Sequence, residues 1–240
     1  VDPDRLEIRL PEDFELPAEG LNIRYGTMPT VLEERLFLHK LPAAQAFARA
    51  NGLDRIALDS PRRRLGIVTT GKAYLDVRQA LDELGIDATR AADLGLSVYK
   101  VGMSWPLEGE GARAFAEGLE EILVIEEKRP VVEEQFAKLL YNLERRPRLL
   151  GKQDAAGQPL LPSVGELEPD RVVGVIGDWL ARKLEAFSVP ACPGEAVTLR
   201  TDPTGLTRLP SFCSGCPHNT STAVPEGSVA MGGIGCHGMA

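Results

Sequence analysis

The chain has 240 residues, and its 27 Lys and Arg against 35 Asp and Glu give a formal net charge of −8 and a pI near 5.1. This acidic balance excludes a general nucleic-acid binder, because phosphate backbones are held by surplus Lys and Arg. Hydrophobic residues (43%) and charged residues (26%) occur at ordinary globular levels, so the chain can bury a core and need not be disordered. At about 100 to 200 residues per domain, we expect one domain with flanking segments.

The sequence carries no signal for a membrane or for secretion. No apolar run approaches the ~18 residues of a membrane helix, and the N-terminus lacks the basic-then-apolar layout of a signal peptide. Four cysteines are too few for a disulfide scaffold. We therefore expect a cytoplasmic protein without membrane contact. Because the chain starts at Val1 and stops at Ala240 inside a Gly-rich run, we also expect an internal fragment.

Residues 1–61 are predicted to form a connector followed by a helix. Pro, Asp and Glu are frequent in residues 1–30, and the alternating run Leu6 to Leu10 predicts a short edge strand. Apolar residues then recur at helical spacing from Val31 to Asn51, and Gly52 is a typical helix stop. We expect this helix to pack against the rest of the protein, with His39 as a packed histidine and not a metal ligand.

Residues 62–187 are predicted to form an α/β domain. Short apolar strands alternate with helices of about ten residues, and parallel strands need such crossover connections. We therefore expect a mostly parallel sheet with helices on both faces. The expected strands are 65–69, 96–103 and 122–126, and the expected helices are 73–84, 109–118, 130–141 and 171–187. The acidic pairs Glu120-Glu121 and Glu126-Glu127, which flank the clearest strand, are expected to be solvated.

The end of the chain changes character twice. Residues 188–209 are rich in Pro and Gly, which is typical of an interdomain linker, and Cys192 within them is expected to be an unengaged thiol. Residues 210–240 then hold three of the four cysteines and two of the three histidines. This clustering makes the Cys-rich tail the main candidate for chemistry.

Cys213 and Cys216 form a Cys-x-x-Cys pair, which places two thiols on one tight turn where both can reach the same metal. Gly215 between them permits the backbone twist that such a turn needs. Cys236, on a second Gly-rich turn, supplies a third ligand. Taken alone, the pattern fits a zinc site completed by His218 or His237, an iron–sulfur cluster, or a redox dithiol. The dithiol is disfavoured because the motif lies between prolines and not at the start of a helix.

Two other segments could bind an anion. The glycines of residues 232–238 would let backbone amides approach a phosphate, but the stretch lacks the Lys-Ser/Thr of a P-loop. The segment Thr69-Thr70-Gly71-Lys72 follows a strand and opens a helix, which is a place where anions bind. A tight strand-to-helix turn is the better interpretation of this second segment.

The longer motifs resemble a known family. Phe-Cys-Ser-Gly-Cys-Pro-His-Asn-Thr-Ser-Thr at 212–222 and Gly-Ile-Gly-Cys-His at 233–237 are similar to the start of the thiamine diphosphate domain in indolepyruvate ferredoxin oxidoreductases, which belong to the 2-oxoacid:ferredoxin oxidoreductase family. Upstream, Gly-Lys-Ala-Tyr-Leu-Asp-Val-Arg at 71–78 and Tyr-Lys-Val-Gly-Met at 99–103 extend the resemblance over nearly the whole chain.

The resemblance implies a fold and a set of site residues. The α/β domain would resemble the C-terminal domain of transketolases, and residues 210–240 would be the truncated start of the thiamine diphosphate domain. Cys213, Cys216 and Cys236 match three ligands of a [4Fe–4S] cluster, and Gly235 and His237 match the turn near the cofactor's diphosphate. The fourth family cysteine has no counterpart in this chain.

The resemblance also implies an activity for the complete enzyme. With thiamine diphosphate and magnesium, it would oxidatively decarboxylate an aryl 2-oxoacid such as indolepyruvate to acyl-coenzyme A, and pass electrons through the cluster to ferredoxin. A homo-oligomer is expected. Because the chain lacks the Gly-Asp-Gly pattern that holds magnesium and the domain with the activating glutamate, the fragment is expected to be inactive. The alternative is a non-catalytic α/β interaction module with a zinc-binding C-terminal tail.

Overall fold

A computed structural model describes residues 7–22, 26–185, 187–189 and 212–229 of the chain. Contacts within the structure divide the chain into two units, residues 1–191 and residues 192–240, and each unit is described by itself. In the described part of the chain, no helix combines the length and the apolar character needed to cross a membrane.

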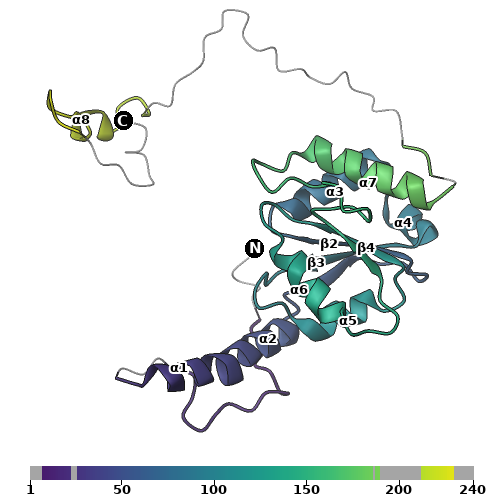
Figure 1. The fold of residues 1–240 in the computed structure, drawn as a ribbon, viewed down its shortest axis with the longest axis horizontal. Helices are drawn as coiled ribbons and strands as arrows, with labels where there is room; N and C mark the ends of the chain where they lie inside the picture. Colours follow the sequence, from purple (N-terminus) through teal and green to yellow (C-terminus); the bar gives the residue numbers. More distant parts are fainter. Residues whose placement is uncertain (1–6, 23–25, 186, 190–211, 230–240) are drawn as a thin grey trace, which may run out of the picture. The chain divides into compact units, whose positions relative to one another are not determined.

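The first unit contains one five-stranded sheet in the order β1-β3-β2-β4-β5 (Figure 1). The four strands β2 to β5 run parallel, and β1 lies antiparallel to β3 at one edge. This arrangement confirms the predicted mostly parallel sheet. The strands are β1 (Arg55–Leu58), β2 (Leu65–Thr70), β3 (Leu96–Val101), β4 (Glu121–Ile125) and β5 (Arg148–Leu150).

Helices cover both faces of the sheet, as predicted. One face packs against α3 (Ala73–Glu83), α4 (Ala88–Leu94) and α7 (Pro169–Lys183), and the other packs against α5 (Gly109–Ala116) and α6 (Val131–Leu140). In the sheet, β3 lies on one side of β2 and β4 lies on the other. Because crossover connections between parallel strands are right-handed, the helices before β3 and the helix before β4 lie on opposite faces of the sheet.

The strands show why the sequence has continuous apolar runs. Along β2, Leu65 and Ile67 belong to the core under α3 and α7, whereas Val68 belongs to the core under α5 and α6. Alternate residues of a strand point to opposite faces, and here both faces are covered. A strand in this position is therefore buried along its length and mostly apolar, with Thr69 as a buried polar exception.

Three short elements were not predicted. The strands β1 and β5 have only four and three residues, which is too short for a periodic pattern. The helix α4 begins after Asp87, whose carboxylate accepts the Arg90 N–H at 2.8 Å, and ends at Gly95 with φ +73°. Asp87 and Gly95 are residue types typical of the start and the end of a helix, so the sequence did contain a signal for α4. Because β1 joins the sheet, the sheet begins at Arg55, ahead of the expected domain start at Arg62.

The edge strand predicted for Leu6 to Leu10 is wrong for residues 7–10, which form no strand; Leu6 lies outside the described residues. The backbone of Arg9 forms its hydrogen bonds with the side chain of Asn51 and not with a neighbouring strand. The Asn51 carboxamide accepts the N–H of Arg9 and donates to its carbonyl, both at 2.8 Å. The linker at 188–209 falls mostly outside the described residues, and the tail at 210–240 is described only for residues 212–229, so these boundaries remain predictions.

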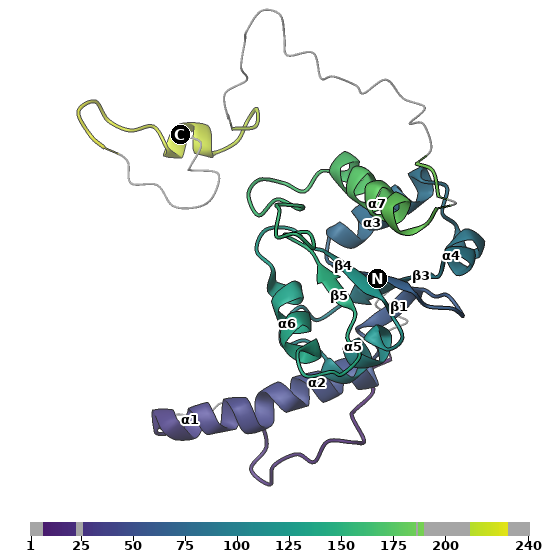
Figure 2. The same ribbon diagram turned by 45° about the vertical axis from the view of Figure 1, so that its right-hand side comes forward.

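The N-terminal helix is interrupted by a wider turn. It consists of α1 (Pro29–Arg35), the π-helical segment η2 (Leu36–Lys40) and α2 (Leu41–Ala50) (Figure 2). Pro42 has no N–H for a helical hydrogen bond and crowds the turn before it. The turn before it is π-helical, and the N–H of Leu41 donates to the carbonyl of Leu36 five residues back.

Only the base of this helix packs as predicted. Ala46 and Ala48 are buried, the Gln45 side chain donates to the Leu107 carbonyl at 2.7 Å, and the Arg49 guanidinium lies 2.8 Å from the buried Glu108 carboxylate. The expectation that the whole apolar side packs is wrong for α1 and η2, because these segments extend away from the sheet (Figure 2). His39 is accordingly only half-buried and is not a core residue.

Candidate functional site

The second unit contains the predicted Cys-x-x-Cys turn. The Cys216 N–H donates to the Cys213 carbonyl at 3.0 Å, and Gly215 has φ +76°, a conformation that favours glycine. The Asn219 carboxamide donates to the same Cys213 carbonyl at 3.2 Å. After the turn, α8 (His218–Ser221) forms a single helical turn. The local structure therefore places both cysteines on one tight turn.

Both thiols are free, with Cys213 exposed and Cys216 half-buried. Thiolates are the usual protein ligands of iron–sulfur clusters, so the donor chemistry of this turn fits two positions of such a cluster. Within the described residues, no three His, Cys, Asp or Glu side chains are grouped to hold a metal ion. The other predicted site residues, Cys236, Gly235 and His237, lie outside the described residues, as does Cys192. The ligand set as a whole remains a prediction.

His218, considered above as a zinc ligand, makes other contacts. Its ring lies 5.6 Å from the Phe212 ring, measured between centroids, and its Nδ1 is 3.4 Å from the Ser221 hydroxyl. His218 is not grouped with Cys213 and Cys216 as a metal site among the described residues. A zinc site completed by His218 therefore has no support from this geometry.

The carboxyl ends of the strands are the second place to search, because open α/β sheets bind ligands there. The strand order reverses between β2 and β4, and β2 ends in the Thr69-Thr70-Gly71-Lys72 segment. The Lys72 ammonium group lies 3.2 Å from both the Asp76 and the Glu166 carboxylates and donates to the Leu167 carbonyl at 3.0 Å. The hydrogen bond to Glu166 is the main cause that raises the pKa of Lys72.

Lys72 thus fastens the loop before α7 across the end of β2. The segment is a tight strand-to-helix turn with Gly71 at φ +56°, as interpreted from the sequence. Its lysine is occupied by protein carboxylates and by a backbone carbonyl. This turn offers no free cation to an anionic ligand.

Glu126 directly follows the adjacent strand β4 and is only 3% exposed. Its carboxylate accepts the N–H groups of Val132 at 2.9 Å and of Glu133 at 2.9 Å, in the first turn of α6. The Lys152 ammonium group donates to the Glu126 backbone carbonyl at 2.6 Å. Burial raises the pKa of Glu126 and lowers the pKa of Lys152. The carboxylate and the backbone carbonyl of Glu126 are therefore both hydrogen-bonded to other groups of the protein.

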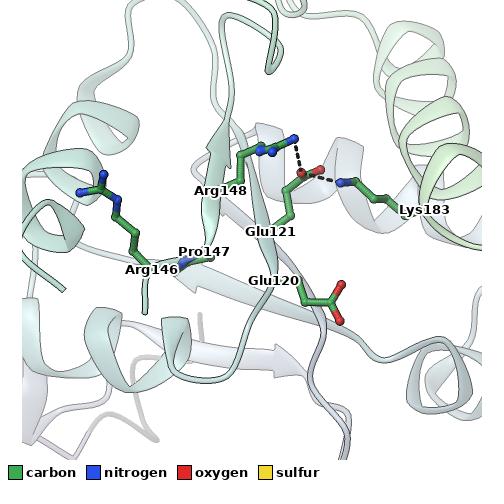
Figure 3. Close-up of a pocket in the computed structure, with 6 residues that line it drawn as sticks. All are labelled: Glu120, Glu121, Arg146, Pro147, Arg148 and Lys183. Carbon is green, nitrogen blue, oxygen red and sulfur yellow. Dashed lines mark hydrogen bonds and ion pairs between the residues drawn. The ribbon is translucent and has the colours of Figure 1, made fainter. Parts of the chain in front are cut away.

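The amino end of β4 carries a second buried carboxylate, Glu121, which is 2% exposed. It accepts the indole N–H of Trp179 at 2.7 Å and the Lys183 ammonium at 2.6 Å, and the Arg148 guanidinium lies 4.0 Å away. Figure 3 shows the carboxylate between Arg148 and Lys183, with Glu120 turned away. An open hollow of about 490 Å³ adjoins these side chains.

The expectation that both acidic pairs are solvated is therefore wrong for one member of each. Glu120 is exposed and pairs with Arg64 at 2.7 Å, but Glu121 and Glu126 are buried. A buried carboxylate requires hydrogen-bonding partners, and for Glu121 these are Trp179 and Lys183, which are distant in sequence. Local sequence could not have indicated these partners.

The α/β domain matches a known family. The model of the indolepyruvate oxidoreductase domain matches residues 55–189, which is more than half of the chain. The indolepyruvate oxidoreductase subunit IorA of Thermococcus kodakarensis is 29% identical over 180 residues, which cover 72% of this chain and 25% of the relative. The subunit IorA of Methanothermobacter thermautotrophicus is 25% identical over 189 residues, covering 77% of this chain and 26% of the relative. The chain spans about a quarter of the length of these relatives.

Solved structures show only distant similarity. A split-gene transketolase in an inactive β4 tetramer covers 53% of this chain and 41% of its own, with a TM-score of 0.36 and 18% identity. The 2-oxoglutarate:ferredoxin oxidoreductase from Magnetococcus marinus covers 65% and 24%, with a TM-score of 0.37 and 16% identity. The family match does not depend on them, since it rests on sequence across the sheet and its helices. This chain belongs to the family of the indolepyruvate oxidoreductase domain.

Proposed function

We propose that the chain is part of an enzyme that oxidatively decarboxylates aryl 2-oxoacids, such as indolepyruvate, to acyl-coenzyme A. The observation that carries the proposal is that the family domain at residues 55–189 is followed in the same chain by a two-cysteine turn. The relatives named above are indolepyruvate oxidoreductase subunits. In this proposal the complete protein is a cytoplasmic homo-oligomer that uses thiamine diphosphate and magnesium and reduces ferredoxin.

Cys213, Cys216 and Cys236 are assigned as three ligands of a [4Fe–4S] cluster, and Gly235 and His237 as neighbours of the diphosphate. When bound, the cluster supplies an acceptor for single electrons. The role of the chain's own residues is to present thiolates: the Cys213–Cys216 hydrogen bond and Gly215 hold the first two on one turn. The α/β domain acts as a scaffold, since its buried carboxylates are used internally. Because the sequence contains no Gly-Asp-Gly, the chain alone is proposed to be inactive.

The cluster is expected in the complete protein and not in residues 1–240 alone, which lack the fourth cysteine. The assignment is therefore tested by anaerobic reconstitution of the chain extended through the rest of the thiamine diphosphate domain, with ferrous iron and sulfide and in parallel with zinc. We expect uptake of about four iron atoms per chain, a brown colour that dithionite bleaches, and little stable zinc. Cys216→Ser should remove most of the iron and the colour, because sulfur is the ligand that a cluster requires.

Cys192→Ser is the matched control, since Cys192 is the one cysteine of residues 1–240 that lies outside the proposed ligand set. Iron content should stay at the wild-type level in this variant. Stoichiometric zinc with no iron in the wild type would support the zinc-binding interaction module instead. Equal iron loss in Cys192→Ser and Cys216→Ser would contradict the ligand set, and far-UV circular dichroism of each variant verifies that the α/β domain is still folded.

A further inference from the structure

Cys213 and Cys216 stand at the first and fourth positions of one β-turn in the second unit. The Cys216 N–H donates to the Cys213 carbonyl at 3.0 Å, and Gly215, at the third position, has φ +76°, as in a type II turn. In a β-turn the first and fourth Cα atoms lie less than about 7 Å apart, and the Cα atoms of a disulfide usually lie about 4.4 to 6.8 Å apart. The turn therefore holds the two cysteines near the separation that a disulfide needs.

This turn is held by hydrogen bonds of the protein itself. The Cys213 carbonyl accepts a second hydrogen bond, from the Asn219 carboxamide at 3.2 Å. The Cys216 carbonyl accepts the Asn219 N–H at 3.1 Å. Because Asn219 belongs to α8, the turn is fastened to the helical turn that follows it (Figure 1). Contacts within this short segment thus keep the two thiols close together.

Both thiols are accessible to a small reagent. Cys213 is exposed and Cys216 is half-buried, and both are free. A redox dithiol was disfavoured above partly because the pair was not expected to precede a helix. That ground does not hold, since α8 begins at His218, two residues after Cys216. In reducing compartments the disulfides that do form are usually transient and serve catalysis or redox sensing, and exposed ones are the most easily reduced.

The chemistry that fits this pair is thiol–disulfide exchange with a small disulfide such as glutathione disulfide. The thiolate of the exposed Cys213 attacks one sulfur of the reagent, which forms a mixed disulfide and releases one glutathione thiolate. The Cys216 thiolate then attacks the Cys213 sulfur, which forms the Cys213–Cys216 bond and releases the second glutathione. The protein loses two electrons and two protons, and the reagent gains both to become two thiols. The second step is favoured because both sulfurs belong to one turn.

We propose that Cys213 and Cys216 form a reversible disulfide when the turn carries no metal, and that this bond withholds both sulfurs from the cluster. An iron–sulfur cluster requires thiolates, and neither sulfur of a disulfide is one. Loading of the cluster then depends on the thiol redox state of the surroundings. The withholding of ligands rests on the proposed function, whereas the formation of the bond does not.

The 240-residue chain tests the bond directly, in the presence of a metal chelator. The chain is equilibrated without oxygen at a series of ratios of reduced to oxidised glutathione, and free thiols are then blocked with N-ethylmaleimide. Cleavage after arginine and glutamate residues, including Glu226, separates the pair from Cys192 and from Cys236. By mass spectrometry we expect one transition, in which Cys213 and Cys216 become unreactive together and their peptide loses two hydrogens.

Gly215→Ala tests whether the turn favours the bond. The dithiol form can leave the turn, but the disulfide cannot, and a residue with a Cβ is disfavoured at φ +76°. At a given glutathione ratio, the ratio of disulfide to dithiol should therefore fall about tenfold, which corresponds to about 1.4 kcal/mol.

Gly227→Ala is the matched control. Gly227 has φ +78° and lies in another turn of the same unit, where the Ser228 N–H donates to the Pro225 carbonyl at 3.0 Å. An added Cβ meets nothing within 4 Å at either glycine, so the two substitutions introduce the same kind of backbone strain. The control should leave the ratio of disulfide to dithiol unchanged.

Several results would overturn the bond. Both thiols could stay free at every glutathione ratio, each could carry only glutathione, or Cys236 could take the place of one partner. An equal fall in Gly215→Ala and Gly227→Ala would remove the role of the turn.

The withholding of ligands is tested in the chain extended through the rest of the thiamine diphosphate domain and loaded with iron. It should form no Cys213–Cys216 disulfide at the glutathione ratios that oxidise the metal-free chain. A disulfide that forms while the iron content is unchanged would show that the pair does not bind the cluster. That result would contradict the proposed function and the withholding of ligands, but not the disulfide itself, so the two failures are distinguishable.

Discussion

A buried glutamate lies at each end of β4, and the two are stabilised by different kinds of hydrogen-bond donor. Each end carries a buried carboxylate, Glu121 at the amino end and Glu126 at the carboxyl end, with 2% and 3% of the residue exposed. Glu121 is held by side chains of α7, namely Trp179 and Lys183. Glu126 is held by backbone N–H groups in the first turn of α6.

This difference shows how one strand fastens helices to opposite faces of the sheet. The helix α7 belongs to the core on one face and α6 to the core on the other. A charged partner such as Lys183 must come from a residue placed by the tertiary fold. The free N–H groups of a helix start are provided by any helix, whatever its side chains. We therefore expect the two ends to differ in how strongly they depend on their carboxylates.

The largest effect is expected at the amino end. Glu121→Ala leaves the Trp179 N–H without its acceptor and Lys183 without its counter-ion, and breaking a buried pair by removing one partner costs about 3 to 5 kcal/mol. Because Lys183 is 33% exposed and can be solvated, the loss should lie near the lower limit of about 3 kcal/mol. Urea unfolding of the 240-residue chain, monitored by far-UV circular dichroism, measures it.

Glu120→Ala is the control for this prediction. Glu120 is the neighbour of Glu121, but it is exposed and pairs with the exposed Arg64 at 2.7 Å. Its removal should change the free energy of unfolding by no more than about 1 kcal/mol. If the two substitutions cost the same, the buried network around Glu121 does not stabilise the packing of α7.

A smaller effect is expected at the carboxyl end. Glu126→Ala removes the side chain that accepts the Val132 and Glu133 N–H groups at the partly buried start of α6. Loss of such a side-chain cap costs about 0.5 to 2 kcal/mol. The same urea titration measures this change, with the neighbouring Glu127→Ala as its control. A loss larger than that of Glu121→Ala would reverse the proposed ranking of the two ends.

The comparison also shows how far the sequence could lead. The central strands were predictable because most of their residues are apolar, and α3, α5, α6 and α7 were predictable from their apolar periodicity. The outer elements β1 and β5 were not, because their three or four residues are assigned by pairing with distant strands. The exposure of apolar residues in α1 and η2 was also missed, because an apolar helical pattern predicts burial without specifying which part of a protein supplies the partner.

The candidate site divides in the same way. The turn of Cys213 and Cys216 was predictable because its spacing and Gly215 are local in sequence. The buried state of Glu121 and Glu126 was not, because adjacent glutamates such as Glu120 and Glu121 look alike in sequence and differ only through their tertiary partners. Burial and hydrogen bonding at such positions are set by residues that are as far apart as Glu121 and Trp179.

The smallest predicted effect concerns the dependence of stability on pH at the carboxyl end of β4. Burial raises the pKa of Glu126 above its ordinary value of 4.5, against the opposing effect of the Val132 and Glu133 N–H groups. The native state then binds this proton more tightly than the unfolded state does. The contribution of Glu126 to stability is therefore fully present below the ordinary value and is lost as the pH rises through the raised pKa.

Glu126→Gln removes this titration but keeps an oxygen that accepts a backbone N–H. We expect the free energy of unfolding of the variant, minus that of the wild type, to increase as the pH rises from below 4.5 through the raised pKa, and to be constant at higher pH. Using the difference between the two proteins cancels the other carboxylates that titrate in this range. Urea unfolding at a series of pH values measures it. A difference that decreases with pH would mean that the backbone N–H groups outweigh burial, so that the charged form of Glu126 is the one the helix start stabilises.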